Sequence, residues 1–199
     1  MRLTRRSALA GCLAPFVAAA PVVAAEPAGD VETVRGEATA QTGSAIRQLA
    51  QNAAVFVGDT VATAAQSAIA LHLGSATLVR LGPEARLRID RFLIKAGGVF
   101  DLAKGPMLFE HNPAAGATET AIRSPFGLIA VRGTRFFAGP SNNVFGVFVF
   151  QGEVTVVGQY TSVQVLAQFG TDIAAPGAEP TQPHSWGAAR IKAAEASVM

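Results

Sequence analysis

The side chains that most often do chemistry are few in this sequence and lie far apart. Its three histidines, His72, His111 and His184, have dissimilar surroundings, and none has a second ligand at the spacing of a metal site. No serine stands in a GxSxG elbow, and no glycine-rich run matches a phosphate loop. The acidic residues are scattered singly, without the spacing of a glycosidase pair. We therefore predict no enzymatic activity, no metal and no cofactor.

The one cysteine, Cys12, lies in a segment with the layout of an export signal. Residues 1–25 have a charged start, an uncharged stretch and small residues immediately before Glu26, which is the pattern of a cleavable signal peptide. The paired Arg5 and Arg6 resemble a twin-arginine signal, and an ordinary secretory signal fits the segment equally well. We predict a periplasmic or secreted protein whose mature form has no transmembrane helix and no thiol.

Much of the positive charge of the chain belongs to this segment. The whole chain has 16 Lys and Arg residues against 14 Asp and Glu residues, for a formal net charge of +2. Residues 1–25 hold three of the basic residues and none of the acidic ones, so the remainder has a net charge of −1. Such a chain lacks the positive surface that binding to phosphates requires, and we expect no nucleic-acid partner.

From residue 26 to residue 174 the sequence repeats short runs of β-forming residues, separated by glycine, proline and other turn residues. Runs at intervals of about 8–12 residues predict an all-β module of many short strands, arranged as a β-solenoid or a β-sandwich. Residues 85–90 alternate apolar and charged side chains, as a strand with one buried face does. Residues 144–150 are apolar on both faces and predict a central strand covered on both sides.

Four arginines on these strands lie close together in the sequence and could form a basic strip for an anionic ligand. Two acidic residues, Glu84 and Asp90, interrupt them. We therefore interpret the arginines as charges on the solvated face of the strands, where they also discourage pairing between sheet edges. They are Arg80, Arg86, Arg88 and Arg91.

The C-terminal part of the chain differs in composition. Residues 174–183 contain three prolines and predict a linker. Ser185 is then expected to cap a short alanine-rich helix that ends near Ala196, with Trp186 and Ile191 docking the helix. The predicted organisation is a signal peptide (1–25), an all-β domain (26–174) and a linker with a short helix (175–199).

Two segments are more specific than a strand pattern requires. The first contains residues 57–63 (VGDTVAT), 67–71 (SAIAL) and 78–83 (LVRLGP), and the second contains residues 124–127 (SPFG), 131–136 (VRGTRF) and 149–156 (VFQGEVTV). In this order they resemble the FecR domain family. That family has a GD-x-[VI]-x-T strand, a serine-led strand and an LGP-like turn, then a T/S-P segment, an RGT-x-F strand and a V-x-x-G-x-V-x-V strand. The resemblance spans about residues 55–174.

The resemblance implies an all-β module that lies outside the cytoplasmic membrane. In the regulator that names the family, this region receives a signal from an outer-membrane receptor. It passes the signal through a membrane span to a cytoplasmic domain that regulates a sigma factor. Neither that N-terminal domain nor the span is recognisable in this sequence, so the chain resembles the stand-alone exported form of the family.

The family motifs also supply the candidate binding residues. The two glycines among them are expected to occupy backbone conformations that other residues avoid. Asp59 and Arg132 are charged residues in apolar segments, and buried charges need partners. One hypothesis is therefore that they pair as an internal clamp or bond nearby carbonyl groups, and the other is that Arg132 and Arg135 are exposed and grip a ligand. The full candidate set is Gly58, Asp59, Arg132, Gly133, Thr134 and Arg135.

Two functions remain open on the sequence. The first is a non-catalytic exported FecR-domain module that binds a protein or another envelope component, such as a receptor, as an accessory in cell-envelope signalling. The second is a structural or surface β protein that associates with itself or binds polysaccharide through its flat faces. No arrangement of nucleophile, base and orienting group favours an enzyme over either.

Overall fold

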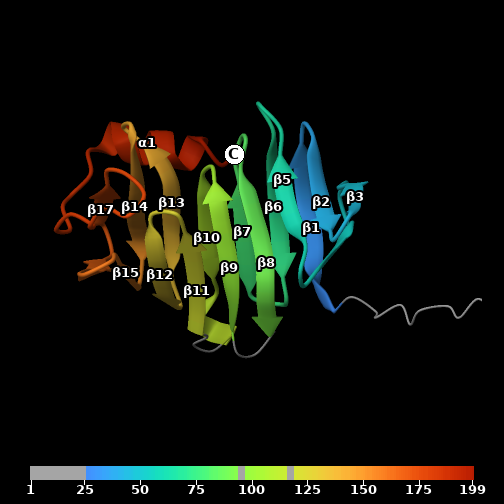
Figure 1. Cartoon of the computed structure of the whole chain (residues 1–199), viewed down its shortest axis with the longest axis horizontal. Helices are drawn as coiled ribbons and strands as arrows, with labels where there is room; N and C mark the ends of the chain where they lie inside the picture. The colour runs from blue at the N-terminus through green and yellow to red at the C-terminus, as the bar shows by residue number, and fades with distance from the viewer. Residues whose placement is uncertain (1–25, 94–96, 116–118) are drawn as a thin grey trace, which may run out of the picture.

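In the computed structural model, which describes residues 26–93, 97–115 and 119–199, the chain forms two β-sheets that face each other (Figure 1). The predicted signal peptide, residues 1–25, lies outside the described residues. The eight-stranded sheet has the order β17 (Gly170–Ile173), β14 (Val144–Gln151), β13 (Arg135–Ser141), β10 (Met107–His111), β7 (Thr77–Leu81), β6 (Ala68–Leu73), β1 (Pro27–Arg35), β4 (Ala54–Phe56). The nine-stranded sheet has the order β16 (Ser162–Leu166), β15 (Glu153–Val157), β12 (Gly127–Arg132), β11 (Glu119–Ser124), β9 (Gly97–Lys104), β8 (Arg86–Leu93), β5 (Thr60–Thr63), β2 (Ala38–Thr42), β3 (Ala45–Gln48). The all-β prediction is confirmed.

The chain builds both sheets together, from one end of the sandwich to the other. In Figure 1 the colour passes from blue at β1 to red at β17. Hairpins are laid down alternately in the two layers, β6–β7 in one, β8–β9 in the other, and later β11–β12, β13–β14 and β15–β16. Between the β8–β9 and β11–β12 hairpins of one sheet, the chain contributes the single strand β10 to the other sheet. Because only one strand intervenes, β9 and β11 run parallel. The two layers thus form a β-sandwich, and the chain adds strands along it from one end to the other, as in a β-solenoid.

The core lies between the sheets and follows from the alternation of the strands. In β12, Ile129 and Val131 are buried, whereas Ala130 and Arg132 are exposed. Rings from both layers meet at the centre, where the centroids of Phe100 and Phe109 are 6.2 Å apart. Burial of each such side chain contributes about 1.5–3 kcal/mol to folding.

Strand β14 is covered on both faces, as predicted. Phe145, Val147 and Val149 pack into the core between the sheets. Phe148 points to the outer face of the eight-stranded sheet, where it joins a second apolar cluster with Phe137 and residues of the C-terminal helix. The apolar run in β14 is therefore explained by burial of its two faces in two separate cores.

Two of the family motifs meet in a buried hydrogen bond. The Thr63 hydroxyl, at the end of β5, donates to the Gly82 carbonyl at 2.6 Å and accepts from the Ala85 amide at 2.9 Å. The threonine of the first motif thereby fixes the LGP turn between β7 and β8. The glycines of the two motifs have left-handed backbones, with φ of 91° at Gly58 and 61° at Gly133, which confirms the expected conformational role.

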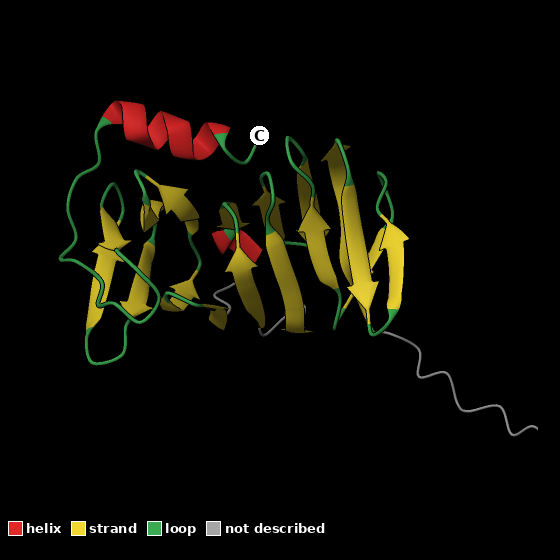
Figure 2. Cartoon of the chain, turned by 45° about the horizontal axis from the view of Figure 1, so that its top comes forward, coloured by secondary structure: helices red, strands yellow, loops and turns green. Residues whose placement is uncertain are grey.

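The C-terminal helix α1 (Ala188–Ala196) covers the outer face of the eight-stranded sheet. Figure 2 shows the helix (red) outside the strand layers. Trp186 and Ala194 are buried against Phe137 and Phe148, with Ile191 partly buried beside them, so the predicted docking residues are confirmed. The predicted start at Ser185 is wrong. The N-cap is Gly187, which has no side chain to form a cap hydrogen bond. The helix begins later than predicted because the indole contact holds Trp186 on the sheet.

Two arginine contacts fasten the helix to the sheet. Arg190 on the helix stacks on Trp186, with its guanidinium 3.5 Å from the ring centroid, and donates to Asp172 of β17 at 2.6 Å and 3.1 Å. From the sheet side, Arg135 at the start of β13 donates to Glu195 of the helix at 3.0 Å. Because these pairs are partly buried and stacked, they hold the helix in register more firmly than exposed ion pairs do.

The proline-containing segment before the helix runs along the sheet edge and is pinned there. A bridge joins His184 to Gly170 of β17, and the Thr181 amide donates to the Asp172 carbonyl at 2.9 Å. The Glu179 carboxylate accepts from the amides of Tyr160 and Thr161. The pKa of Glu179 is lowered from its ordinary value, first by the hydrogen bond from the Thr161 hydroxyl and then by these amides.

Four charges on the outer face of the nine-stranded sheet are paired with one another. Arg123 on β11 contacts Asp90 on β8 at 2.7 Å and Asp101 on β9, and Arg88 lies 3.7 Å from Asp90. The hydrogen bond to Asp101, followed by that to Asp90, raises the pKa of the Arg123 guanidinium. The solvated-face interpretation is thus confirmed for Arg88. In the part of the chain that the structure describes, no helix combines the length and hydropathy that crossing a membrane requires.

Candidate functional site

The six motif residues lie in two turns at the same end of the sandwich. Gly58 and Asp59 precede β5, and residues 132–135 lead from β12 into β13. Strands β11, β9 and β8 stand between β12 and β5 in the nine-stranded sheet. At about 4.8 Å per strand, the two turns are roughly 19 Å apart. The structure therefore does not bring the two motifs into one site.

Asp59 is the centre of a polar cluster inside the fold. Its side chain is fully buried. The carboxylate accepts hydrogen bonds from the Thr42 hydroxyl at the end of β2, from the Arg47 guanidinium on β3 and from the Phe56 amide on β4, the last at 2.8 Å. One carboxylate thus joins three strands to the start of β5, including one edge strand of each sheet, β4 and β3.

The predicted clamp between Asp59 and Arg132 is wrong, although Asp59 is buried and paired as the argument required. Its partner is Arg47, whose guanidinium also lies 5.1 Å from the centroid of the Phe56 ring. Arg132 is exposed. The sequence could not single out Arg47, because it lies on β3, a short and mostly exposed edge strand that we did not predict and whose residues lack an alternating pattern.

The other residues of the RGTR motif have separate places. Thr134 is buried at 1% exposure beside Gly152, and its hydroxyl has no hydrogen-bond partner among the described residues. Arg135 reaches over the Phe150 ring, 4.5 Å from its centroid, and forms ion pairs with Glu110 and Glu195. Of the motif's charged groups, Arg132 alone lies on an open surface.

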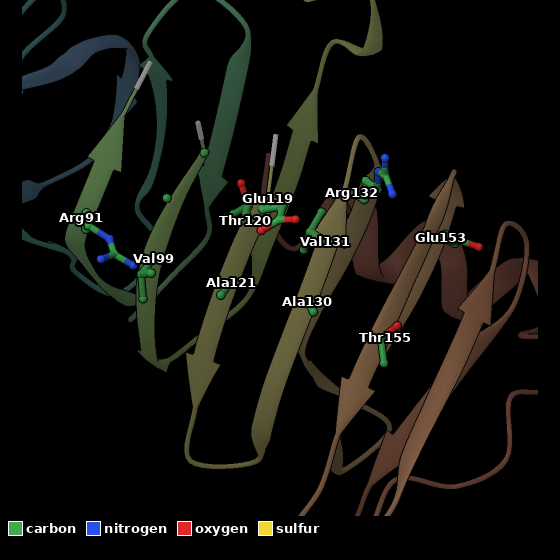
Figure 3. A pocket seen from close by; sticks show the side chains of 12 residues that line it. Arg91, Val99, Glu119, Thr120, Ala121, Ala130, Val131, Arg132, Glu153 and Thr155 are labelled. Carbon is green, nitrogen blue, oxygen red and sulfur yellow. The ribbon is translucent and has the colours of Figure 1, made fainter. Parts of the chain in front are cut away.

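Arg132 borders a hollow of about 590 Å³ on the outer face of the nine-stranded sheet, shown in Figure 3. Strands β8, β9, β11, β12 and β15 contribute to it. Its floor is made of small side chains, Val99, Ala121 and Ala130, with the Thr155 hydroxyl beside them. Four charged residues surround this floor: Arg91, Glu119, Arg132 and Glu153.

Strand register assembles these charges. Glu119 and Arg132 face each other as partners of the β11–β12 pair, and Val131 faces Val154 in β12–β15, which places Arg132 beside Glu153. Sequence reasoning missed Glu119 and Glu153 as site residues, because neither follows a motif that marks it. Only pairing of distant strands puts them next to Arg132.

The charges of the hollow differ from the neighbouring charges on this face. Among the described residues, none of the four is within ion-pair distance of an opposite charge, whereas Arg88, Asp90, Asp101 and Arg123 are paired. Glu153 accepts one hydrogen bond, from the Gln164 side chain at 2.8 Å. Exposed charges without an ion-pair partner retain hydrogen-bonding capacity for a ligand. Two cations and two anions around a small apolar floor suit a partner that carries both charges, as protein surfaces do.

Metal binding has no support in the geometry of the described residues. No group of three or more His, Cys, Asp and Glu side chains gathers within it. His111 is buried and its Nδ1 lies 3.0 Å from the Thr77 hydroxyl, and His72 is exposed and lies 3.9 Å from Glu32.

Comparison with known proteins supports the motif assignment. A family model described as FecR protein matches residues 59–155, which includes Asp59, the second motif turn and all the residues that line the hollow. Two crystal structures of a protein from Parabacteroides distasonis, provisionally described as an anti-sigma factor, share the fold with a TM-score of 0.56 and 14% identity, over 67% of this chain. The chain spans 63% and 62% of the length of those two chains. None of the curated proteins matches the chain.

Proposed function

We propose, from the match of the FecR family model to residues 59–155, that the chain is a non-catalytic exported FecR-domain module that binds a protein of the cell envelope as an accessory in signalling. The hollow beside Arg132 is the proposed contact surface. The observation that carries the proposal is the ring of four charges that form no ion pair among the described residues, beside charges that are paired, Arg123 with Asp90 and Asp101.

The form of the hollow supports a protein partner over a small molecule. It has charged residues at its margin and a floor of alanine, valine and threonine side chains. Small-molecule sites are commonly concave and mostly apolar. A margin of unpaired Arg and Glu side chains instead gives electrostatic complementarity, which steers a protein partner and fixes its orientation.

Photo-cross-linking in the native host tests this surface. A photoreactive residue at Ala121, on the floor of the hollow, should form an adduct with one discrete envelope protein. The same residue at Ala62, a comparable position on the outer face of β5, is the matched control and should not. Equal adducts from both positions, or none from Ala121, would count against the proposal.

Charge reversal at Arg132 should reduce that adduct about tenfold, which corresponds to about 1.4 kcal/mol of binding free energy. Because Arg132 is exposed but lies between Glu119 and Glu153, Arg132→Glu should lower the free energy of unfolding by about 1 kcal/mol at most. Arg35→Glu, an exposed arginine at the end of β1 in the other sheet, should leave the adduct unchanged. An equal loss in both variants would indicate a general charge effect and contradict the assignment of the hollow.

Self-association through β16 is a second candidate function. This strand ends the nine-stranded sheet, and three large apolar side chains lie exposed at or near it: Leu166 (53%), Phe169 (43%) and Tyr160 (83%). Open strand edges are templates for pairing with another chain. Sedimentation velocity should then show a dimer that Leu166→Lys combined with Phe169→Lys dissociates and that Ile46→Lys, on the opposite edge strand, does not. A monomer at all concentrations would exclude this candidate.

A further inference from the structure

A groove opens at the end of the sandwich opposite the hollow, and the proposed function makes no use of it. It lies where β9 ends, beside the turn between β11 and β12, the β13–β14 turn and the segment that follows β17. Its volume is about 450 Å³, which falls within the range of about 300–1,000 Å³ that is typical of small-molecule sites.

The walls of the groove are apolar. Phe126 and Phe145 form its aromatic side, with their rings stacked at 4.4 Å and an interplanar angle of 7°. Leu102 is buried at its base, and Val144 lies partly exposed in the wall. The remaining wall contains alanine and proline residues, including Ala175. Such a lining offers dispersion contacts and apolar burial to a hydrocarbon chain.

Positive charge marks the mouth of the groove. Lys104 at the end of β9 is the one charged side chain in the lining, and it is exposed. Arg86 faces it as its partner in the β8–β9 pair. Neither residue forms an ion pair with any described residue, so two cations stand at this position without a neutralising carboxylate. An occupant with an anionic head would satisfy them.

We propose that this groove binds a free fatty acid, with the hydrocarbon chain between Phe126 and the segment after β17 and the carboxylate beside Lys104. Both parts of the ligand have a counterpart in the structure. The apolar walls remove the chain from water, and the ammonium group at the mouth pairs with the carboxylate while it remains in solvent. An uncharged apolar ligand would leave the cations at the mouth unused.

Calorimetric titration with dodecanoate, below its aggregation concentration, tests the groove. Dodecanoate should bind the unmodified protein, and Ala175→Trp should weaken the binding at least about tenfold, because the indole occupies the space of the chain. Ala65→Trp is the matched control, since Ala65 is exposed in the turn between β5 and β6 and does not line the groove. This control should bind normally. No binding, or equal binding by both variants, would overturn the proposal.

The head-group contact is tested with Lys104→Gln. Because Lys104 is exposed, the loss should be modest, about threefold for dodecanoate, and it should shrink at high salt. Dodecan-1-ol should bind more weakly than dodecanoate and should be insensitive to this change. If the alcohol binds as tightly as the acid, the occupant is an uncharged apolar molecule. A dimer that Ala175→Trp dissociates would assign the groove to a second copy of the chain, and either result would overturn the fatty-acid proposal.

Discussion

Replacement of Asp59 by alanine is expected to lower the free energy of unfolding by about 3 kcal/mol. The Asp59 carboxylate is fully buried and accepts hydrogen bonds from Thr42, Arg47 and the Phe56 amide. Its loss leaves the Phe56 amide and the Thr42 hydroxyl without their acceptor and detaches β3 and β4 from the start of β5. The Arg47 side chain is 35% exposed and can turn to water, which keeps the loss below that of a fully buried ion pair.

Urea unfolding measures this loss as a change of midpoint at constant slope. Asp90→Ala is the matched control, because Asp90 forms its ion pairs on the solvated face of the nine-stranded sheet. It should cost no more than about 1 kcal/mol. A cycle that adds Arg47→Ala to Asp59→Ala should show strong coupling between the two residues. Equal destabilisation by Asp59→Ala and Asp90→Ala would show that the buried cluster does not hold the fold.

Truncation of Trp186 to alanine is expected to cost about 4 kcal/mol. The indole is 6% exposed and lies between the sheet and the helix, with its ring centroid 5.1 Å from that of Phe148 and 6.4 Å from that of Phe137. The Arg190 guanidinium stacks on its other side. Without the indole, α1 should separate from the sheet, and Phe137 and Phe148 should become accessible to an apolar dye.

Trp186→Phe separates packing from hydrogen bonding at this position. The indole Nε1 has no hydrogen-bond partner among the described residues, so replacing the indole with a phenyl ring removes no hydrogen bond. This variant should cost about 1 kcal/mol and should not increase dye binding. If Trp186→Ala unfolds at the same denaturant concentration as the unmodified protein and binds no dye, the helix is not an integral cover of the eight-stranded sheet.

Local patterns in the sequence were sufficient for much of the fold. Alternation in residues 85–90 and the apolar run 144–150 predicted strands that the structure contains, because side-chain burial in a strand follows a period of two. The edge strand β3 was missed, since its residues are mostly exposed and carry no such period. The helix start was placed two residues too early, because the docking of Trp186, a tertiary contact, delays the first turn.

The glycines of β14 and β17 show the same division between local and tertiary causes. A Cβ at Gly146 or Gly170 would overlap the Trp186 ring. In the sequence, Gly146 only interrupts an apolar run. The reason for a glycine at this position appears only in the tertiary structure, where the indole of Trp186, forty residues further along the chain, lies on the strand.

The sequence by itself determined the class of the fold, the FecR-type motifs and the conclusion that Asp59, a charge in an apolar segment, must have partners. Each of these follows from interactions between near neighbours or from the cost of burying a charge. The tertiary structure decided which partner Asp59 has, that Arg132 is exposed, and that Arg91, Glu119 and Glu153 surround the same hollow. Those results depend on the order and register of strands far apart in the chain, and register is set by the packing of the whole sandwich.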